Sequence, residues 1–421
     1  MSTPVFVYIQ LGATDHFVGR LWPRMGKRSQ GAAFEYDRSW LENPSRFALE
    51  PALSLHPGSF HTPPGKAIFG AIGDSAPDRW GRILMRRAAR RQEQKTGKAP
   101  RSLREIDFLL LVDDEARQGA LRFAGVEGGP FLSRSESGRI PPMLKLARLL
   151  RAAENVIADK DSDEDLQMLL APGSSLGGAR PKASVRDRNG NLIIAKFPHK
   201  DDEIDVVVWE GVALNLARQA GISVPDTRIK KIDNKPILLS CRFDRMGNNR
   251  IPFLSGMSMI GAEDNEIRSY LELADALRRY GARPREDLKN LWKRMVFNIL
   301  ISNVDDHLRN HGFLYSGTGG WTLSPAYDLN PTPVDVKPRI LSTAVDYEDQ
   351  TASLENAFAV AEYFGIDPTQ ANNIVAEVGR AVTQWDCVAG EFGLSRADID
   401  RMSTAFEHDD LKIARKTIKT S

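Results

Sequence analysis

The chain has 421 residues, of which 42% are hydrophobic and 27% are charged, and its formal net charge is +2. This composition is ordinary for a soluble globular protein, and so small a net charge gives no sign of a nucleic-acid or membrane partner. A chain of this length exceeds a single hydrophobic core, so two or three domains or lobes are expected.

The cysteines, the opening residues and the apolar runs favour a cytoplasmic protein. Cys241 and Cys387 are the only cysteines, too few and too far apart for a disulfide framework. The opening residues, MSTPVFVYIQ, lack the basic region and the apolar run of a signal peptide. No stretch approaches the roughly 20 apolar residues that span a bilayer, so no membrane partner is expected.

The first part of the chain predicts short strands followed by a basic helix. VFVYIQL, FVGRLWP and AAFEYD alternate weakly and are separated by Gly and Pro. Asp74 or Ser75 is expected to cap the basic helix, with Pro77 near its first turn. The polar stretch 133–142, SRSESGRIPP, indicates a linker.

The middle of the chain predicts a hairpin, a helix and a strand pair, and the later part is mostly helical. Asn189-Gly190 between two β-rich runs is typical of a hairpin turn. Residues 206–220 predict a helix that ends at Gly221. Another strand pair surrounds PILLSCRFDR, and helical patterns prevail after about residue 264. Strands first and helices later favour an α+β fold with two lobes.

The densest chemistry lies after the long helix pattern that ends near residue 303. Asp305 is followed five residues later by Asn310 and then, beyond a predicted hairpin, by Asp328. Phosphoryl transfer needs a carboxylate that orients the attacking hydroxyl and oxygen ligands that hold Mg²⁺, and protein kinases place these groups at similar spacings. Asp306 is a second candidate base, although the spacing favours Asp305, and His307 could hold the loop or position a carboxylate. The alternative is a polar turn between a helix and a strand.

A nucleotide-binding segment is expected upstream. The loop GSSLGGARPK precedes a strand, which suits backbone N–H groups that approach phosphates, with Arg180 and Lys182 as nearby cations. Lys196, in LIIAKFP, could pair with the phosphates and be oriented by Glu210 of the next helix. The alternatives are a flexible surface loop and an edge lysine that reaches water beside an exposed glutamate.

The segment ILLSCRFDR could connect two lobes. Backbone groups around Ser240, Cys241 and Arg242 could then meet the edge of an adenine, with Phe243 on its face. The alternative is a core strand that Phe243 merely helps to fill.

Together these segments resemble the HipA family of serine/threonine kinases, the toxins of bacterial toxin–antitoxin modules. The motifs that carry the resemblance are IGDSAPDRWG, GSSLGGARPK, AKFP, RFDR, SNVDDHLRNHGF and SPAYDLNP. The resemblance implies an α+β, two-lobed, protein-kinase-like fold that binds ATP and Mg²⁺. Its expected parts are a β-rich N-terminal subdomain at 1–130, a nucleotide-binding part at 145–250 and an all-helical lobe at 251–421.

The resemblance also implies residue roles. Asp305 would be the catalytic base, and Asn310 and Asp328 the Mg²⁺ ligands. The implied ATP-binding residues are Ser175, Gly177, Gly178, Ala179, Arg180, Lys182, Lys196, Glu210, Cys241, Phe243 and His307. Ser175, or its neighbour Ser174, would be autophosphorylated, which would inactivate the enzyme because a dianion in a phosphate-binding loop repels ATP. Cys241 stands where the family often has Glu, so backbone rather than side-chain contacts to adenine are expected there.

The partners implied by the resemblance are a HipB-like helix-turn-helix antitoxin and, through their complex, operator DNA. The implied substrate is a protein of the translation machinery, such as an aminoacyl-tRNA synthetase. A basic stripe could touch DNA phosphates, although a solvated face beside acidic neighbours is favoured. The stripe consists of Arg79, Arg82, Arg86, Arg87, Arg90, Arg91, Lys95 and Lys98.

Two other functions are compatible with these patterns. A degenerate kinase could act only as a corepressor, but Lys196, Asp305, Asn310 and Asp328 are all present. A small-molecule phosphotransferase could use a similar Asp-to-Asn loop, but GSSLGGARPK and IGDSAPDRWG disfavour it.

Overall fold

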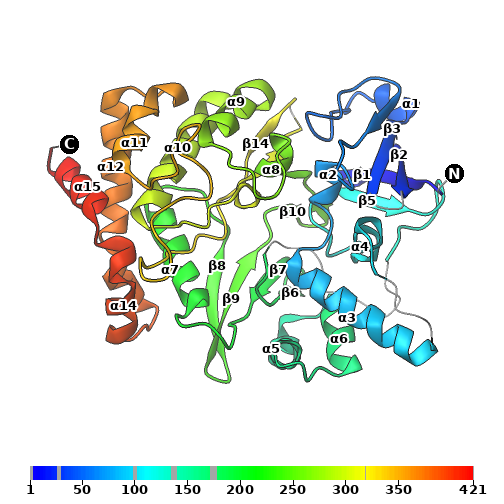
Figure 1. The fold of residues 1–421 in the computed structure, drawn as a ribbon, viewed down its shortest axis with the longest axis horizontal. Coiled ribbons are helices and arrows are strands. Elements are labelled where there is room, and N and C mark those ends of the chain that lie inside the picture. Colours follow the sequence, from blue (N-terminus) through cyan, green and yellow to red (C-terminus); the bar gives the residue numbers. More distant parts are fainter. Residues whose placement is uncertain are drawn as a thin grey trace. The chain divides into compact units, whose positions relative to one another are not determined.

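The computed structural model describes residues 3–25, 30–97, 102–133, 140–170, 178–317 and 319–420. The chain forms two compact units (Figure 1), Met1–Asp201 with Lys230–Leu254 and Asp202–Ile229 with Ser255–Ser421. The first unit carries most of the strands and the second most of the helices, which confirms the predicted α+β class. No described helix combines the length and the apolar character that crossing a membrane requires.

The N-terminal part of the first unit is a five-stranded antiparallel sheet in the order β4-β3-β2-β1-β5. Its strands are β1 Val5–Leu11, β2 Thr14–Met25, β3 Gln30–Tyr36, β4 Ser59–His61 and β5 Leu121–Ala124. Short helices α1 Arg38–Leu41 and α2 Gly70–Gly73 follow β3 and β4. A Cβ at Gly19 would lie 2.1 Å from the Glu35 carbonyl oxygen, so the pairing of β2 with β3 requires glycine there.

The second sheet has the order β6-β7-β9-β8. Its strands are β6 Lys182–Arg186, β7 Leu192–Lys196, β8 Thr227–Ile232 and β9 Lys235–Cys241, followed by β10 Arg245–Met246, β11 Asn249–Arg250 and β12 Phe253–Ser255. Strands β6 and β7 pair antiparallel around Asn189-Gly190, and Gly190 has φ +83°, which confirms the predicted hairpin. The predicted strand pair around PILLSCRFDR is confirmed by β8 and β9.

Three helices form the core of the first unit with this second sheet. They are α3 Arg79–Thr96, α5 Leu146–Ile157 and α6 Asp163–Leu170. Their apolar faces meet alternating side chains of β6, β7 and β9, such as Val185, Ile193 and Leu239. The remaining helix of this unit, α4, spans Glu105–Leu111, and a 3-10 turn at Met143–Lys145 leads into α5. Residues 134–139 of the predicted linker lie outside the described residues.

The N-terminal cap of α3 differs from the expectation. Asp78 caps the helix by accepting a hydrogen bond from the Gly81 N–H at 2.7 Å. Asp74 ends α2, and the Ser75 hydroxyl donates to the Ile72 carbonyl, so neither residue can serve the next helix. The expectation of a cap at Asp74 or Ser75 was therefore wrong by one turn.

The second unit is built from helices around α10. Its helices are α7 Val206–Gln219, α8 Gly256–Met259, α9 Tyr270–Tyr280, α10 Pro284–Leu300, α11 Leu354–Ala359, α12 Pro368–Val382, α13 Trp385–Glu391, α14 Arg396–Phe406 and α15 Asp409–Thr420. Helix α10 is buried along most of its length, from Leu288 to Leu300, and contacts α9 and α12. Gly221, with φ +70°, lies just beyond α7 as predicted.

The helical pattern expected after about residue 264 is interrupted in places. Helix α11 is followed by a 3-10 turn, Ala361–Phe364, which Gly365 ends in a left-handed conformation. A hairpin, β13 Gly312–Tyr315 with β14 Trp321–Leu323, lies within the helical part as predicted and leads toward Asp328.

Candidate active site

The loop after α10 presents Asp305 to solvent. Helix α10 ends at Leu300, and Ser302 takes a left-handed φ of +51°, which turns the chain into the loop. The side chain of Asp305 is 56% exposed, and its Oδ1 lies 3.8 Å from the Lys337 ammonium nitrogen. An exposed carboxylate beside a cation can meet an incoming hydroxyl without rearrangement of the core.

Its neighbour Asp306 is buried and holds the loop in place. The Asp306 carboxylate accepts hydrogen bonds from the Tyr270 hydroxyl at 2.7 Å and from the Ser342 and Thr343 N–H groups at 3.0 and 3.2 Å. Burial raises the pKa of Asp306 to about 7, against the lowering effect of these three donors. Of the two acids considered as the base, only Asp305 is accessible.

Asn310 closes the loop onto Asp305. Its side-chain Nδ2 donates to the Asp305 carbonyl at 2.9 Å, and its N–H donates to the His307 carbonyl at 2.7 Å. A 3-10 turn at Leu308–Asn310 makes both contacts possible. Because Nδ2 faces the backbone, the amide oxygen Oδ1 is the atom that could bind a cation. The buried Nδ1 of His307 has no hydrogen-bond partner among the described residues.

His311 supports the same turn from inside the unit. Its Nε2 lies 3.1 Å from the Asp306 carbonyl oxygen, which can only accept, so Nε2 carries the proton. Burial lowers the pKa of His311 to about 3, and the nearby Arg294 contributes to the lowering. His311 is therefore a neutral structural donor.

Asp328 lies just past the β13–β14 hairpin in a left-handed conformation, φ +57°. Asp tolerates this region better than most residues, and such strain is often found at functional sites. The Asn330 side-chain Nδ2 donates to Asp328 Oδ1 at 3.3 Å, and the Tyr327 hydroxyl donates to the Arg309 carbonyl at 2.7 Å. The Tyr327 bond attaches the Asp328 segment to the loop that carries Asp305.

A small pocket lies beneath these segments. Asn303, Asp306, Asn310 and Tyr327 contribute to its wall. Its volume of ≈ 10 Å³ is about the room that one water molecule needs, so it is too small for a nucleotide. The pocket is therefore a small gap in the packing under the loop.

The residues expected to hold Mg²⁺ have suitable chemistry. Asn310 and Asp328 offer one amide oxygen and one carboxylate, and Mg²⁺ is commonly bound by one or two protein oxygens plus substrate phosphates and water. Within the described ranges, no three His, Cys, Asp or Glu side chains come together as a metal cluster. The two residues thus fit an ion that a nucleotide brings with it.

The predicted phosphate loop is described only from Gly178 onward. Ser174, Ser175 and Gly177 lie outside the described residues. Gly178 has φ +89°, and its carbonyl accepts a hydrogen bond from the Trp80 N–H at 3.4 Å.

Lys182 follows the phosphate loop and is buried. Its ammonium nitrogen lies 3.0 Å from Asp78 Oδ2, and its carbonyl accepts a hydrogen bond from the Trp80 indole at 3.0 Å. The motifs IGDSAPDRWG and GSSLGGARPK therefore meet in the fold. Ala179 is exposed, and Arg180 is half-buried.

Lys196 and Glu210 lie on different units. Lys196 ends β7, directly opposite Lys182 in the strand register, and is half-buried. Glu210 is buried in α7 of the second unit. In the connector, Cys241 ends β9 opposite Ile193 and is half-buried. The half-buried ring of Phe243 lies 6.4 Å from that of Phe253.

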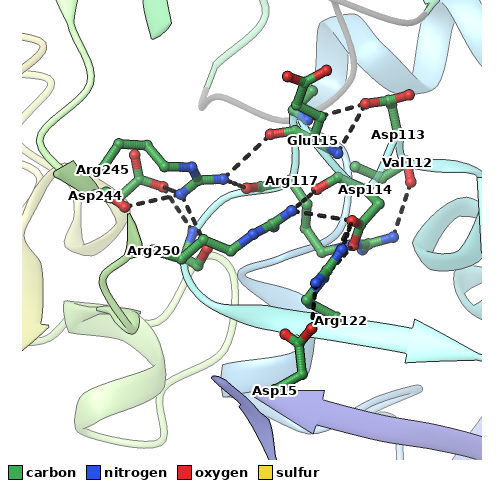
Figure 2. Close-up of polar contacts among 12 residues, drawn as sticks. Asp15, Val112, Asp113, Asp114, Glu115, Arg117, Arg122, Asp244, Arg245 and Arg250 are labelled. Atoms are coloured by element: carbon green, nitrogen blue, oxygen red, sulfur yellow. Dashed lines mark hydrogen bonds and ion pairs between the residues drawn. The ribbon is translucent and has the colours of Figure 1, made fainter. Parts of the chain in front are cut away.

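The connector is fixed by a buried network of charges that the sequence did not reveal (Figure 2). Asp244 is bound by Arg242, at 2.8 Å from its Nε, and by Arg245 at 2.8 Å. Arg242 also donates to the Ala116 carbonyl at 2.6 Å, so the guanidinium is not available to a nucleotide. Burial alone would raise the pKa of Asp244, but Arg242 and Arg245 hold it well below its usual range.

The network continues into the five-stranded sheet. Arg250 donates to the Asp114 carbonyl at 2.6 Å, and Arg122 lies between Asp114 and Asp15 (Figure 2). The Gly119 N–H donates to Asp244 Oδ2 at 2.8 Å. Residues far apart in sequence thus share one set of counterions. The motif RFDR belongs to this network, but no pattern in the sequence predicted which residues the motif would contact.

The basic stripe on α3 is partly neutralised. Arg87 pairs with Asp159 and Asp161, Arg91 with Asp161 and Asp163, and Lys95 with Asp163. Arg82 binds both oxygens of Glu105. These pairs agree with a solvated face beside acidic neighbours. Lys98 lies outside the described residues.

Comparison with known families identifies the chain. Residues 10–123 match the HipA N-terminal domain, and residues 174–385 match the HipA-like C-terminal domain, which alone is half of the chain. The chain belongs to the HipA family. The HipA assignment covers most of the five-stranded sheet, except for the larger part of β1, and the loop from Asp305 to Asp328.

The chain is also similar to individual HipA-like proteins and structures. It is 23% identical over 340 residues to “Putative kinase Y4mE” of Sinorhizobium fredii, covering 73% of this chain and 74% of that protein. A Haemophilus influenzae protein named “Putative kinase” is 22% identical over 225 residues, which are 46% of this chain and 65% of that protein. The HipA of Shewanella oneidensis, solved with HipB and its operator DNA, has the same fold at 15% identity, with a TM-score of 0.64 over 98% of this chain and 97% of that one.

Proposed function

We propose that this HipA-family chain is an ATP- and Mg²⁺-dependent serine/threonine protein kinase that acts as the toxin of a bacterial toxin–antitoxin module in the cytoplasm. The observation that carries the proposal is the contrast between two adjacent acids. Asp305 is exposed, whereas Asp306 is buried under three donors and holds the loop. Two of the similar proteins are named as putative kinases, which supports the same function.

In the proposed reaction, Asp305 accepts the proton of a serine or threonine hydroxyl. The hydroxyl oxygen forms a bond to the γ-phosphorus of ATP, and the bond from that phosphorus to the β–γ bridging oxygen breaks, so ADP leaves. Asn310 and Asp328 would hold Mg²⁺, which neutralises phosphate charge when bound. Asn310 is suited to this role because its Nδ2 is occupied by the Asp305 carbonyl and its Oδ1 is available.

The proposed nucleotide contacts are those that the family resemblance implies. Gly178, Ala179, Arg180, Lys182 and Lys196 would surround the phosphates together with Ser175 and Gly177, and Cys241 and Phe243 would meet the adenine. Glu210 and His307 complete the proposed set. Asp78 balances the charge of the buried Lys182.

Regulation and partners are part of the same proposal. Phosphorylation of Ser175, or of Ser174, would place a dianion among the phosphate-binding groups and switch the kinase off. A HipB-like antitoxin would bind the chain, and their complex would bind operator DNA, as the Shewanella structure has for its own HipA. The proposed target is a protein of the translation machinery, such as an aminoacyl-tRNA synthetase. The proposed parts remain 1–130, 145–250 and 251–421.

The decisive experiment combines labelling with proteomics. Purified chain is incubated with Mg²⁺ and γ-labelled ATP, alone and with a cell extract, and phosphosites are mapped after brief induced expression. We expect Ser175 or Ser174 to be labelled, and one protein of the extract to dominate the other sites. Both signals should be lost in Asp305→Asn and Asp328→Asn. Labelling of a metabolite without any protein site would overturn the proposal.

A further inference from the structure

A continuous path of hydrogen bonds runs through the second unit from Asp306 to Asp328. The Tyr270 hydroxyl donates to Asp306 Oδ2 at 2.7 Å and accepts from Asn298 Nδ2 at 3.0 Å. The Asn298 amide oxygen accepts from Asn303 Nδ2 at 3.1 Å. Beyond Asn303 the path continues to the segment that carries Asp328.

Asn330 completes the path. Its N–H donates to Asn303 Oδ1 at 3.2 Å, and its side-chain Nδ2 donates to Asp328 Oδ1 at 3.3 Å. The path therefore starts beside the proposed base and ends at a proposed metal ligand. Its members come from α9, α10, the loop after α10 and the segment after β14.

Four members of the path are deeply buried. Tyr270, Asn298, Asn303 and Asp306 are each at most 3% exposed. The two side-chain amides each donate and accept along the path, so their orientations are fixed by their partners. Buried hydrogen bonds of this kind favour one arrangement of Tyr270, Asn298 and Asn303, because any other leaves their polar groups without partners. At the Asp328 end, the side-chain Oδ1 of Asn330 is buried without a hydrogen-bond partner among the described residues.

We infer that Tyr270, Asn298 and Asn303 are positioning residues that set the separation between the loop of Asp305 and the segment of Asp328. The inference rests on the proposed kinase function. Phosphoryl transfer depends mainly on the placement of the base and the metal ligands, and a misplacement of about 1 Å can cost about 100-fold in rate. Neither loop is held by regular secondary structure at the two acids, so the path adds a buried constraint to the bond between Tyr327 and the Arg309 carbonyl.

Tyr270→Phe is the cleanest variant because it removes one oxygen from the middle of the path. The ring also packs edge-on against His311, with centroids 5.2 Å apart, and this contact is retained in the variant. We expect kcat to fall about 10- to 100-fold and the Mg²⁺ concentration for half-maximal rate to rise. The Kd for ADP measured without metal should stay within about two-fold, because the base and the metal ligand are displaced and the nucleotide contacts are not.

The chain contains a matched control for lost stability. Tyr36 is a buried tyrosine of the five-stranded sheet whose hydroxyl donates to the Leu53 carbonyl at 2.7 Å and accepts from the Leu49 N–H at 3.1 Å. Tyr36→Phe therefore removes the same number of buried hydrogen bonds far along the chain from the two acids. We expect a comparable fall in melting temperature with kcat and Mg²⁺ dependence unchanged.

Asn303 provides a graded test. Asn303→Asp keeps an oxygen for the Asn330 N–H but loses the donor to Asn298, whereas Asn303→Leu loses both. We expect kcat to fall further in the leucine variant than in the aspartate variant.

The outcomes separate the inference from the proposed function. A wild-type chain that phosphorylates neither itself nor any protein would overturn the kinase proposal. An active wild type with Tyr270→Phe equal to it in kcat and Mg²⁺ dependence would overturn the inference alone. The inference would also fall if Tyr36→Phe lost as much activity as Tyr270→Phe, because the effect would then reflect stability in general.

Discussion

The ammonium group of Lys182 and the carboxylate of Asp78 form a buried ion pair, 3.0 Å apart, with both side chains only 4% exposed. The pair joins the first residue of β6 to the cap of α3. Asp78 thus has two roles, since Oδ1 caps the helix and Oδ2 balances the lysine. One carboxylate fixes the helix relative to the end of the phosphate loop.

Asp78→Asn separates the two roles. Asparagine caps helices about as well as aspartate, so the cap is retained and only the charge balance is lost. A buried charge without its partner typically costs about 3–5 kcal/mol. We therefore expect the free energy of unfolding, measured by urea denaturation, to fall by about that amount.

Asp163→Asn is the matched comparison. Asp163 pairs with Arg91 and Lys95, but its side chain is 44% exposed. Exposed ion pairs of this kind contribute little to stability, so we expect a much smaller loss than in Asp78→Asn. If the free energy of unfolding fell equally in the two variants, burial would not make the Asp78–Lys182 pair stronger than an exposed pair.

Asp305→Asn is expected to abolish phosphate transfer without changing stability. The amide cannot accept the proton of the attacking hydroxyl, and loss of a general base typically lowers the rate by about 100- to 10,000-fold. Asp305 is exposed, so the melting temperature should stay close to that of the wild type. Radiolabel incorporation and thermal unfolding of the same preparation measure both. A variant with full activity would remove Asp305 from the role of base.

Asp306 makes stability depend on pH in a predictable direction. The carboxyl ionises near pH 3.9 in an unfolded chain but near pH 7 in the folded protein. Between these values the folded state keeps a proton that the unfolded state has released, so its contribution to stability, full below about pH 4, is lost as the pH rises through 7. We expect the free energy of unfolding of the wild type, relative to Asp306→Asn, to fall by at most about 1.4 kcal/mol per pH unit in this window. A flat difference between pH 4 and 8 would contradict the assignment.

Asp244 produces the opposite dependence. Its pKa is held below the usual value by Arg242 and Arg245, so its contribution is present above about pH 4 and is lost as the pH falls through the lowered folded value. Asp244→Asn leaves both guanidinium groups without this partner, and we expect a loss of about 3–5 kcal/mol at pH 7. Denaturant titrations at pH 7 and in acid should show the wild type and the variant converging in acid.

Glu42→Gln is the control for Asp244→Asn, because it also removes one negative charge. Glu42 pairs with Arg38 one helical turn away, and both side chains are well exposed. Its removal should leave the free energy of unfolding nearly unchanged. A parallel shift in the acid profiles of both variants would point to net charge rather than to the Asp244 network.

Local patterns predicted most of the fold because they depend on near neighbours. The hairpin at Asn189-Gly190, the helix ending at Gly221 and the hairpin before Asp328 all follow from turn chemistry or from apolar spacing. The cap of α3 was misplaced because Asp74, Ser75 and Asp78 all have capping side chains. Only the hydrogen bonds at the end of α2 decide between them.

The candidate site was predictable in its residue types but not in its supports. The spacing of Asp305 and Asn310 selected a loop, yet it could not show that Asp306 turns inward, because that depends on Tyr270 and on the Ser342 and Thr343 N–H groups. The path through Asn298 and Asn303 could not be predicted from the sequence for the same reason. Asparagines within a helix pattern look like exposed polar residues until the fold buries them.

The charges around Asp244 have a consequence for how genes of this family can be rearranged. Asp114, Ala116 and Gly119 fall within the segment that matches the HipA N-terminal domain, whereas Arg242, Asp244 and Arg250 fall within the one that matches the C-terminal domain. A chimera that joins the first domain of this chain to the second domain of a relative would keep only this chain's half of the counterion set. Such a recombinant should therefore fold well only where both halves of the network are taken from this chain.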